Sequence, residues 1–485
     1  MLALAVFSTW NSRHYVSMTS ILVIHGLRHD YRPTVAQNVL SMANYSKVSE
    51  VEFVNVFGVI PDKSLAETVI LTYDFLALRN LPIWKLLVKR VSHVIKDCRF
   101  RVAMPQDDYS CSGILDDFCV EHEVTHMYSP ITKDLEVLYP RLSKSRAIFK
   151  EALTGYVDEK VFTKLQKYAQ PFSERRVDVG QRVRLLLPHL GELAERKGTL
   201  ALQFGDVAKT VGFVCDISVK PEDVLLGDEW YKFLGNTKFT IGRKGGASLA
   251  DPRGNLADRV RRYKLRHPTA SNTEVRRKVR LDSGCSGDFS AISPRMFESA
   301  AMGTCQILEQ DLYFPGFEPW RHYIPIDLDH LADQKVFAAM RDTDLAQEIV
   351  KNAYEFLVQS GNYSYRTFIQ GLLREINIQE GSEQPTVKDS SISLDAATGV
   401  DGTALEWLQD YLARAIRSGA LKRIRRMVAD GTFTPLDEVD HAWKSHALTH
   451  RESLLAWIDG IRSGSLIVES VAVPWRSASS YLTSL

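Results

Sequence analysis

The sequence predicts an α/β protein made of two successive parallel-sheet units. Short apolar runs alternate with helical patterns along the chain, which is typical of parallel strands joined by helical crossovers. The alternation stops at a polar stretch around residues 170–176 and then starts again. The chain has 485 residues, which is enough for two or three domains.

The first alternation opens with residues 20–26, a short apolar run that ends in glycine and reads as a buried strand. Further strands are expected at 51–57, 69–73, 101–104 and 124–128, and helices at 33–44, 82–97 and 112–121. Ligands of such sheets bind beyond the carboxyl ends of the strands. His25 and the pair Asp107–Asp108 stand at two of these ends.

The second alternation gives a unit of similar size, and a cleft is expected between the two. Its strands are expected at 177–180, 211–217, 238–242, 305–309 and 322–326. Its helices are expected at 183–197, from Ser293 onward, and at 329–340, 343–359 and 364–375.

The complete division of the chain follows from these patterns and from shifts in composition. It is a leader at 1–17, a first Rossmann-like domain at 18–172, a second at 173–375, a linker at 376–402 and a helical tail at 403–485. The tail opens with a capping box at Thr403 and carries many basic residues. We interpret it as a packing or oligomer helix in preference to a membrane-surface helix.

Composition narrows the class of protein and its compartment. The formal net charge is +1, so the overall charge indicates neither a nucleic-acid nor a membrane partner. The six cysteines are scattered without a C-x-x-C spacing, which is typical of a reduced cytosolic protein. No apolar run approaches the roughly 20 residues that a membrane helix needs. We therefore expect a cytoplasmic protein, with a peripheral membrane contact of the tail as the alternative.

Residues 122–126 match the zinc-protease pattern H-E-x-x-H. A zinc site of that kind needs both histidines on one helical turn. Here a helix is expected to end near Glu121, and the residues from Val124 onward have strand chemistry. We therefore interpret the match as accidental and predict no metal site.

Residues 253–280 contain ten Lys and Arg residues against two acidic residues. An RNA-binding patch is one interpretation of this density. Tyr263 is the one aromatic residue within the stretch, and no known nucleic-acid motif is present. A solvated insertion, or a charged patch beside an anionic substrate, is the favoured interpretation.

The stretch from Ser293 to Thr304 reads as a helix that presents a cation and a carboxylate on one face. Ser293 is a suitable N-cap and Pro294 a suitable first residue. Arg295 then lies in the first turn, where the helix dipole disfavours a cation unless an anion joins it. Glu298 follows three residues later and shares its face. A surface ion pair is the plain alternative.

Two more features are candidate parts of a site. Residues 240–248 form a glycine-rich segment after a strand, and such a loop lets backbone amides approach a phosphate. Asp108 or His25 is placed to accept a proton or to orient a sugar hydroxyl. For either residue alone, a structural hydrogen bond is the commoner explanation.

Together these segments resemble the bacterial GT-B glycosyltransferases related to the CgeB-like, family 1-type group. The resemblance rests on residues 292–300, on 322–325 with Asp329, on 177–182 and on 105–109. It spans roughly residues 20–375 and leaves the tail uncovered. It implies the GT-B fold, in which two Rossmann-like domains face a cleft.

The resemblance also implies a function and its residues. A hexosyltransferase-type enzyme of polysaccharide biosynthesis would bind a nucleotide sugar, a UDP- or GDP-sugar, in the second domain and a glycan, lipid-linked or protein acceptor in the first. Glu298 would meet the ribose, and Arg295 would stabilise the diphosphate without a metal or other cofactor. The remaining donor-site residues would be Arg182, Gly242, Gly245 and Ser248, and the acceptor would meet Asp108 or His25.

This chain departs from the pattern of many retaining relatives at two positions. Ser290 stands where they carry a second glutamate, and Lys244 stands where the glycine-rich loop often has an acidic residue. A GT-B-shaped protein that binds a nucleotide sugar or glycan without chemistry is therefore the alternative function. A zinc hydrolase is a third and more distant one.

Overall fold

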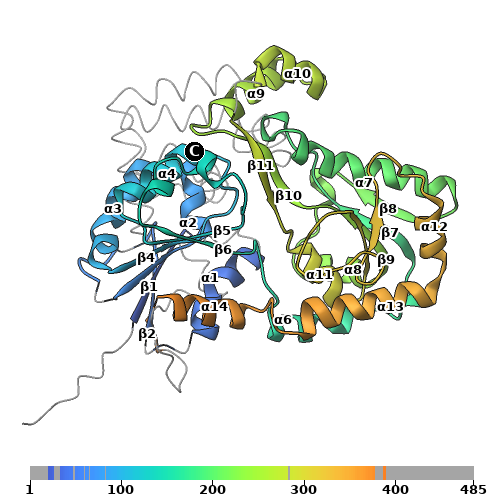
Figure 1. Cartoon of the computed structure of the whole chain (residues 1–485), viewed down its shortest axis with the longest axis horizontal. Helices are drawn as coiled ribbons and strands as arrows, with labels where there is room; N and C mark the ends of the chain where they lie inside the picture. The colour runs from blue at the N-terminus through green and yellow to red at the C-terminus, as the bar shows by residue number, and fades with distance from the viewer. Residues whose placement is uncertain are drawn as a thin grey trace, which may run out of the picture.

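The computed structural model describes residues 20–376, apart from 27–32, 47, 49, 59, 65, 82–83 and 282–284, together with 386–388. Two lobes lie side by side, and each is built on its own sheet (Figure 1). The predicted leader and helical tail lie outside the described residues. Of the predicted linker, residue 376 and a short strand at 386–388 are described.

Among the described residues, the sheet of the first lobe has seven strands in the order β14-β2-β1-β3-β4-β5-β6. All of its pairs are parallel. Its strands are β1 (Ser20–His25), β2 (Glu50–Asn55), β3 (Thr68–Leu71), β4 (Phe100–Ala103), β5 (His126–Ser129), β6 (Ile148–Glu151) and β14 (Thr386–Lys388).

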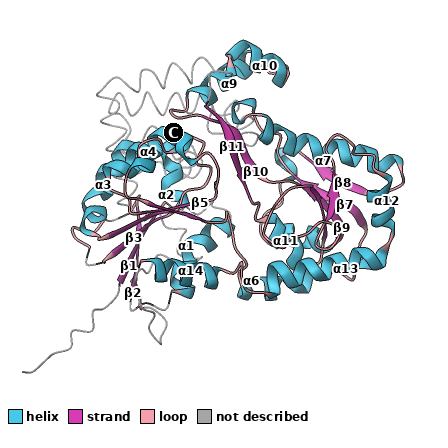
Figure 2. Ribbon diagram, in the orientation of Figure 1, coloured by secondary structure: helices cyan, strands magenta, loops and turns pink. Residues whose placement is uncertain are grey.

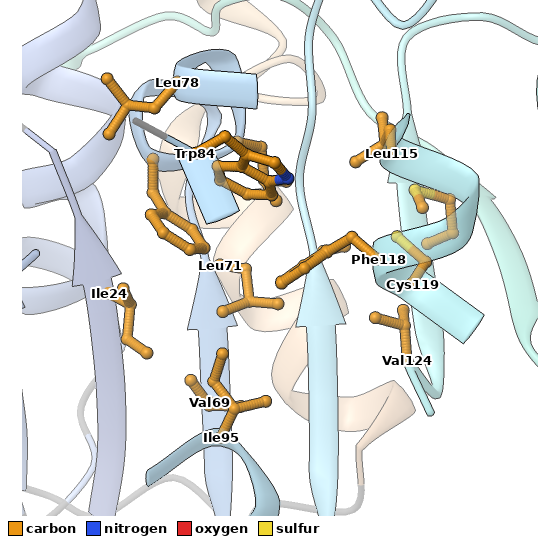
Figure 3. Close-up of a cluster of buried hydrophobic side chains, with 14 of the residues drawn as sticks. Ile24, Val69, Leu71, Leu78, Trp84, Ile95, Leu115, Phe118, Cys119 and Val124 are labelled. Carbon is orange, nitrogen blue, oxygen red and sulfur yellow. The ribbon is translucent and has the colours of Figure 1, made fainter. Parts of the chain in front are cut away.

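Helices cover both faces of this sheet. The described ones are α1 (Pro33–Tyr45), α2 (Tyr73–Ala77), α3 (Trp84–Asp97), α4 (Ser112–Glu121), α5 (Leu135–Leu138) and, beyond β6, α6 (Glu159–Leu165). Alternate strand residues face opposite ways, so Leu22 and Ile24 pack against α2, α3 and α4, while Ile21 and Val23 pack against α1. Figure 3 shows the first of these cores, where the rings of Trp84 and Phe118 lie 5.1 Å apart.

Among the described residues, the sheet of the second lobe has five parallel strands in the order β13-β12-β9-β7-β8. They are β7 (Val177–Arg182), β8 (Cys215–Ser218), β9 (Thr237–Gly242), β12 (Cys305–Glu309) and β13 (Ile324–Ile326). The helices around it are α7 (Glu192–Thr210), α8 (Asp228–Gly235), α11 (Arg295–Ala301), α12 (Gln334–Arg341) and α13 (Thr343–Tyr354). Two parallel α/β units therefore confirm the predicted fold class.

An insertion between β9 and α11 leaves the second sheet and reaches the first lobe. It consists of the antiparallel strands β10 (Gly245–Ala250) and β11 (Cys285–Ala291), with α9 (Asn255–Arg266) and α10 (Asn272–Val279) at their far end (Figure 2). Ala247, Ala250 and Phe289 are fully buried within the core of the first lobe.

The last described helix also joins the lobes. After α13 and a π-helical turn at Glu355–Gln359, the chain returns to the first lobe as α14 (Tyr365–Glu375). Ile369 and Leu373 are fully buried there beside α1. Because both the insertion and α14 cross between the lobes, the domain boundaries at residues 172 and 375 stay predictions.

Three local predictions were wrong. The helix expected at 183–197 begins at Glu192, because Pro188 and Gly191, with φ at +83°, interrupt the earlier residues. The glycine-rich segment expected to be a loop is strand β10 from Gly245 onward. Ser293 was expected to cap the helix that follows it, but helix α11 begins at Arg295 and no side chain caps it.

None of the helices in the described part of the chain has the length and apolar character needed to cross a membrane.

Candidate functional site

The second sheet has a topological switch point between β7 and β9. From β7 the chain continues to β8 on one side, whereas β9 lies on the other side of β7. Ligands of open α/β sheets bind in the crevice outside the carboxyl ends of the strands at such a point. Gln181 and Gly242, near the ends of β7 and β9, therefore mark the expected place of a ligand.

Three cations converge on this place. Lys197 projects from α7, Arg243 follows β9 and Arg295 opens α11. Burial, together with the charges of Arg295 and Arg243, lowers the pKa of Lys197 to about 8. A Cβ at Gly245 would lie 3.3 Å from the Lys197 Nζ, so the start of β10 forms one wall around this ammonium. We name Lys197, Arg243 and Arg295 the cationic cluster.

Arg295 is held in place by polar and aromatic contacts. Its Nη1 donates to Gln181 Oε1 at 3.2 Å, and its guanidinium lies 5.4 Å from the centre of the Trp230 ring. Gln181 is itself fixed, because its Nε2 donates to the Thr240 Oγ1 at 3.3 Å and to the Ile241 carbonyl. The guanidinium is thus positioned at the switch point before any ligand arrives.

Arg243 is balanced by one carboxylate. Its Nε lies 2.9 Å from Glu309 Oε2, at the end of β12. Burial raises the pKa of Glu309, and the neighbouring Arg243 acts in the opposite direction. Glu298 of α11 and Asp107 of the first lobe also face the cationic cluster. The guanidinium and ammonium donors that converge here suit an anion with several acceptor oxygens, such as a diphosphate.

Glu298 and Arg295 lie on the same face of α11, as predicted, because both side chains contact Trp230. Glu298 Oε2 accepts a hydrogen bond from the indole Nε1 at 2.8 Å. The residue is 7% exposed, and burial raises its pKa. The contact of Glu298 with a ribose stays a prediction, and in this conformation the indole occupies one of its oxygens.

Arg182 faces away from the cationic cluster. Its Nη2 lies 2.8 Å from Asp216 Oδ1, its Nη1 donates to the Asp216 carbonyl at 2.9 Å, and its guanidinium lies 4.3 Å from the centre of the Phe233 ring. These contacts tie β7 to β8 and α8. The structure therefore does not bring Arg182 together with Arg295.

The glycines and Ser248 follow the base of the insertion. Gly242 ends β9, and Gly245 opens β10 beside Lys197. Ser248 lies farther along β10, where its Oγ accepts from the Leu193 amide at 3.4 Å, in the first turn of α7. Gly245 therefore lies at the cationic cluster, while Ser248 contacts the start of α7.

The acidic pair of the first lobe is divided between two environments. Asp108 is 0% exposed, and its Oδ2 accepts from Ser129 Oγ at 2.6 Å and from Tyr139 OH at 2.5 Å. Burial raises its pKa. Asp107 is exposed, with φ at +48°, and its Oδ1 accepts from Tyr109 OH at 2.6 Å. Its charge raises the pKa of Lys197, so it faces the cationic cluster across the lobes.

His25 ends β1 at the switch point of the first sheet, between β1 and β3. It is 2% exposed, and its ring lies 6.2 Å from that of Phe53. The next residue, Gly26, donates its amide to Asp74 Oδ2 at 2.5 Å. His25 is thus at the predicted strand end but enclosed by side chains.

The H-E-x-x-H residues straddle a helix–strand junction, as predicted. Helix α4 ends at Glu121 and β5 begins at His126. His122 Nε2 lies 2.9 Å from Ser92 Oγ, whereas His126 Nδ1 lies 3.0 Å from Thr125 Oγ1. The two imidazoles therefore have separate partners and are not placed on one helical turn.

The sequence interpretation missed Lys197, Arg243, Gln181 and Trp230. Lys197 belongs to a helix with several charged residues, so its sequence neighbours do not distinguish it. Trp230 lies 68 residues before the Glu298 that it contacts. The sequence offered one signal for Gln181 and Arg243, which is that they adjoin the carboxyl ends of strands β7 and β9, where ligands of such sheets bind.

Comparisons with known proteins give weak likenesses. No family model matches the chain, and no curated protein matches it. Among solved structures, Anabaena HepE in complex with UDP-glucose is 9% identical, with a TM-score of 0.39 and coverage of 74% of this chain and 99% of that one.

Two further structures are similar to the same degree. Sucrose-phosphate synthase from Thermosynechococcus elongatus is 11% identical, with a TM-score of 0.38 and coverage of 74% and 98%. TarM is 15% identical, with a TM-score of 0.34 and coverage of 62% and 58%. Likenesses at these TM-scores determine no activity, which has to rest on the residues of the site.

Proposed function

We propose that this chain is a GT-B glycosyltransferase that moves a sugar from a nucleotide-sugar donor to a glycan, lipid-linked or protein acceptor. The observation that carries the proposal is the cationic cluster at the switch point of the second sheet. Lys197, Arg243 and Arg295 come from three different segments and lie close enough for both arginines to act on the charge of Lys197, beside the strand ends where a nucleotide would bind.

The cluster suits the chemistry of the donor. When the bond between the sugar and the diphosphate breaks, negative charge accumulates on the departing nucleoside diphosphate. Fixed cations stabilise that charge without reorganising during the reaction, and they do so without a metal ion. Lys197 supplies its charge below the pKa of about 8 and loses it above.

We assign the acceptor side to Asp107 in preference to Asp108. A general base must come within hydrogen-bond reach of the acceptor hydroxyl. Asp107 is exposed and faces the cationic cluster, whereas Asp108 is enclosed with Ser129 and Tyr139. Asp108 then supports the loop that carries Asp107, and His25 lines the neighbouring strand end.

The finer assignments rest on the sequence resemblance. They are a UDP- or GDP-sugar as donor, Glu298 at the ribose, transfer of a hexose in bacterial polysaccharide biosynthesis, and kinship with the CgeB-like group. A cytoplasmic location rests on the six cysteines, which are all free thiols.

The test is a donor screen that measures release of the free nucleoside diphosphate, preceded by calorimetry with UDP and GDP. Binding with release in the presence of acceptor supports the proposal. Binding without release indicates the non-catalytic alternative. No binding of any nucleoside diphosphate refutes the glycosyltransferase and the nucleotide-sugar-binding form of the alternative.

A further inference from the structure

The far end of the insertion is a compact and strongly basic arm. The arm comprises residues 253–280, with α9 and α10 beyond the tips of β10 and β11 (Figure 1). It contains ten Lys and Arg residues against Asp258 and Glu274. The whole chain has a net charge of only +1, so the remainder of the chain is acidic and the positive charge is concentrated here.

The arm is folded and fixed to both lobes. Leu256, Val260 and Val275 are buried in a small core of its own. Arg253 Nη1 lies 2.8 Å from Asp117 of α4, and Arg276 lies 2.5 Å from Glu195 of α7. A merely solvated insertion would need neither its own core nor an anchor in each lobe.

Its exposed face is cationic and hydrophilic. Arg266, Arg277 and Lys278 are exposed. The large exposed hydrophobic residues among the described residues all lie outside the arm. Membrane-surface helices bury an apolar face in the lipid, so a lipid surface is disfavoured. Tyr263 is half-buried and donates to Glu274 at 2.8 Å, and the exposed ring of His267 lies 4.5 Å from the Tyr263 ring. The described arm therefore exposes no Phe, Tyr or Trp ring for stacking on bases.

The arm and the cationic cluster lie at opposite ends of the hairpin formed by the antiparallel strands β10 and β11. Gly245 stands beside Lys197, and Asp251, just after β10, donates its amide to the Tyr109 carbonyl at 2.8 Å. A strand of six residues spans about 20 Å. An acceptor that engages both ends must therefore be a polymer and not a single sugar.

We propose that the arm binds an anionic glycan polymer, which carries carboxylate or phosphate groups along its length and serves as the acceptor. The polymer lies on α9 and α10 and follows the hairpin toward the crevice between the lobes. The identity of the polymer as an acceptor rests on the proposed function, whereas its binding to the arm does not.

The test compares two triple variants of the full chain. One is Arg266→Glu, Arg277→Glu and Lys278→Glu. The matched control reverses three exposed lysines elsewhere, Lys164→Glu, Lys209→Glu and Lys335→Glu. The probes are polygalacturonate and poly(glycerol phosphate), with neutral dextran, phosphatidylglycerol vesicles and single-stranded RNA beside them.

We expect the arm variant to lose roughly tenfold or more in affinity for the two anionic glycans at moderate salt, and the control much less. Dextran should not bind either protein. Equal affinity of both variants for the anionic glycans overturns the proposal, as does tighter binding of the wild type to vesicles or RNA. A triple Gln version of the arm variant and a thermal melt exclude misfolding.

Nucleotide binding distinguishes a failure of the proposed glycosyltransferase function from a failure of the arm proposal. Wild-type protein that binds no nucleoside diphosphate refutes the glycosyltransferase but leaves the polymer measurement valid. If UDP or GDP binds equally to wild type and arm variant while polymer binding is unchanged, only the arm assignment fails.

Discussion

The substitution Lys197→Met should make the free protein more stable while weakening its binding of a nucleoside diphosphate. Burial, with the charges of Arg295 and Arg243, lowers the Lys197 pKa from 10.5 to about 8. At neutral pH the folded protein therefore holds this ammonium at a cost of about 3 kcal/mol as an upper bound, since one pKa unit corresponds to 1.36 kcal/mol. Methionine removes the charge at similar length.

The sign follows from linkage. Because the folded pKa is depressed, the stability linked to this group is fully present above the unfolded pKa of 10.5 and is lost as the pH falls through about 8. The unfolding free energy of the wild type should therefore rise between pH 8 and 10.5 through this group. The Lys197→Met variant should lack that part of the pH dependence.

Binding should change in the opposite direction. A charge-assisted hydrogen bond contributes about 1.5–3 kcal/mol, so its loss weakens UDP or GDP binding by roughly 10- to 100-fold. For the wild type, affinity should fall as the pH rises through about 8, because the ammonium is then neutral.

The assays are chemical denaturation and isothermal calorimetry, each over a pH series. Lys209→Met is the control on the same helix, where the lysine is 57% exposed and lies 3.7 Å from Asp206. It should change either quantity by less than about 0.5 kcal/mol. Lower stability of Lys197→Met together with unchanged nucleotide affinity would refute the assignment of Lys197 to the site.

Four more predictions concern other residues of the chain. Arg295→Ala should lower kcat/KM by roughly 100-fold or more, whereas Arg182→Ala should lower stability and leave nucleotide affinity unchanged; full turnover of the first variant, or weaker binding by the second, contradicts these roles. Phe118→Ala should lower the unfolding free energy by about 3–5 kcal/mol in denaturant titrations, because the ring is 3% exposed and packs against the rings of Trp84 and Phe75. Burial raises the Asp74 pKa from 3.8 to about 6, so its stabilising effect is full below pH 3.8 and is lost as the pH rises through 6. Asp74→Asn should abolish that loss of up to about 3 kcal/mol in a pH series of unfolding, and identical pH profiles would contradict it.

Much of the architecture could be predicted because local patterns carry it. Apolar runs such as Ile21–Ile24 are too short to form helices and too apolar to form strands at the exposed edge of a sheet, so they indicate buried parallel strands. The helix near 192–210 was misplaced for an equally local reason. Its apolar spacing continues upstream, and only the backbone at Gly191 shows where the helix begins.

The insertion could not be predicted, because its burial comes from distant residues. Residues 245–250 are rich in glycine and alanine and read as a loop. They form a strand because residues 285–291 pair with them and because the core of the first lobe covers Ala247 and Phe289. No local periodicity records a partner that lies some 40 residues away.

The sequence by itself determined the two parallel α/β units, the helix of Arg295 and Glu298, and the helix–strand junction within H-E-x-x-H, because each depends on neighbouring residues. Only the tertiary structure decided which charged groups meet. It joined Lys197 and Arg243 to Arg295, held Arg182 on Asp216, and exposed Asp107 while enclosing Asp108. The physical reason is that charges interact through space, whereas the sequence orders them only along the chain.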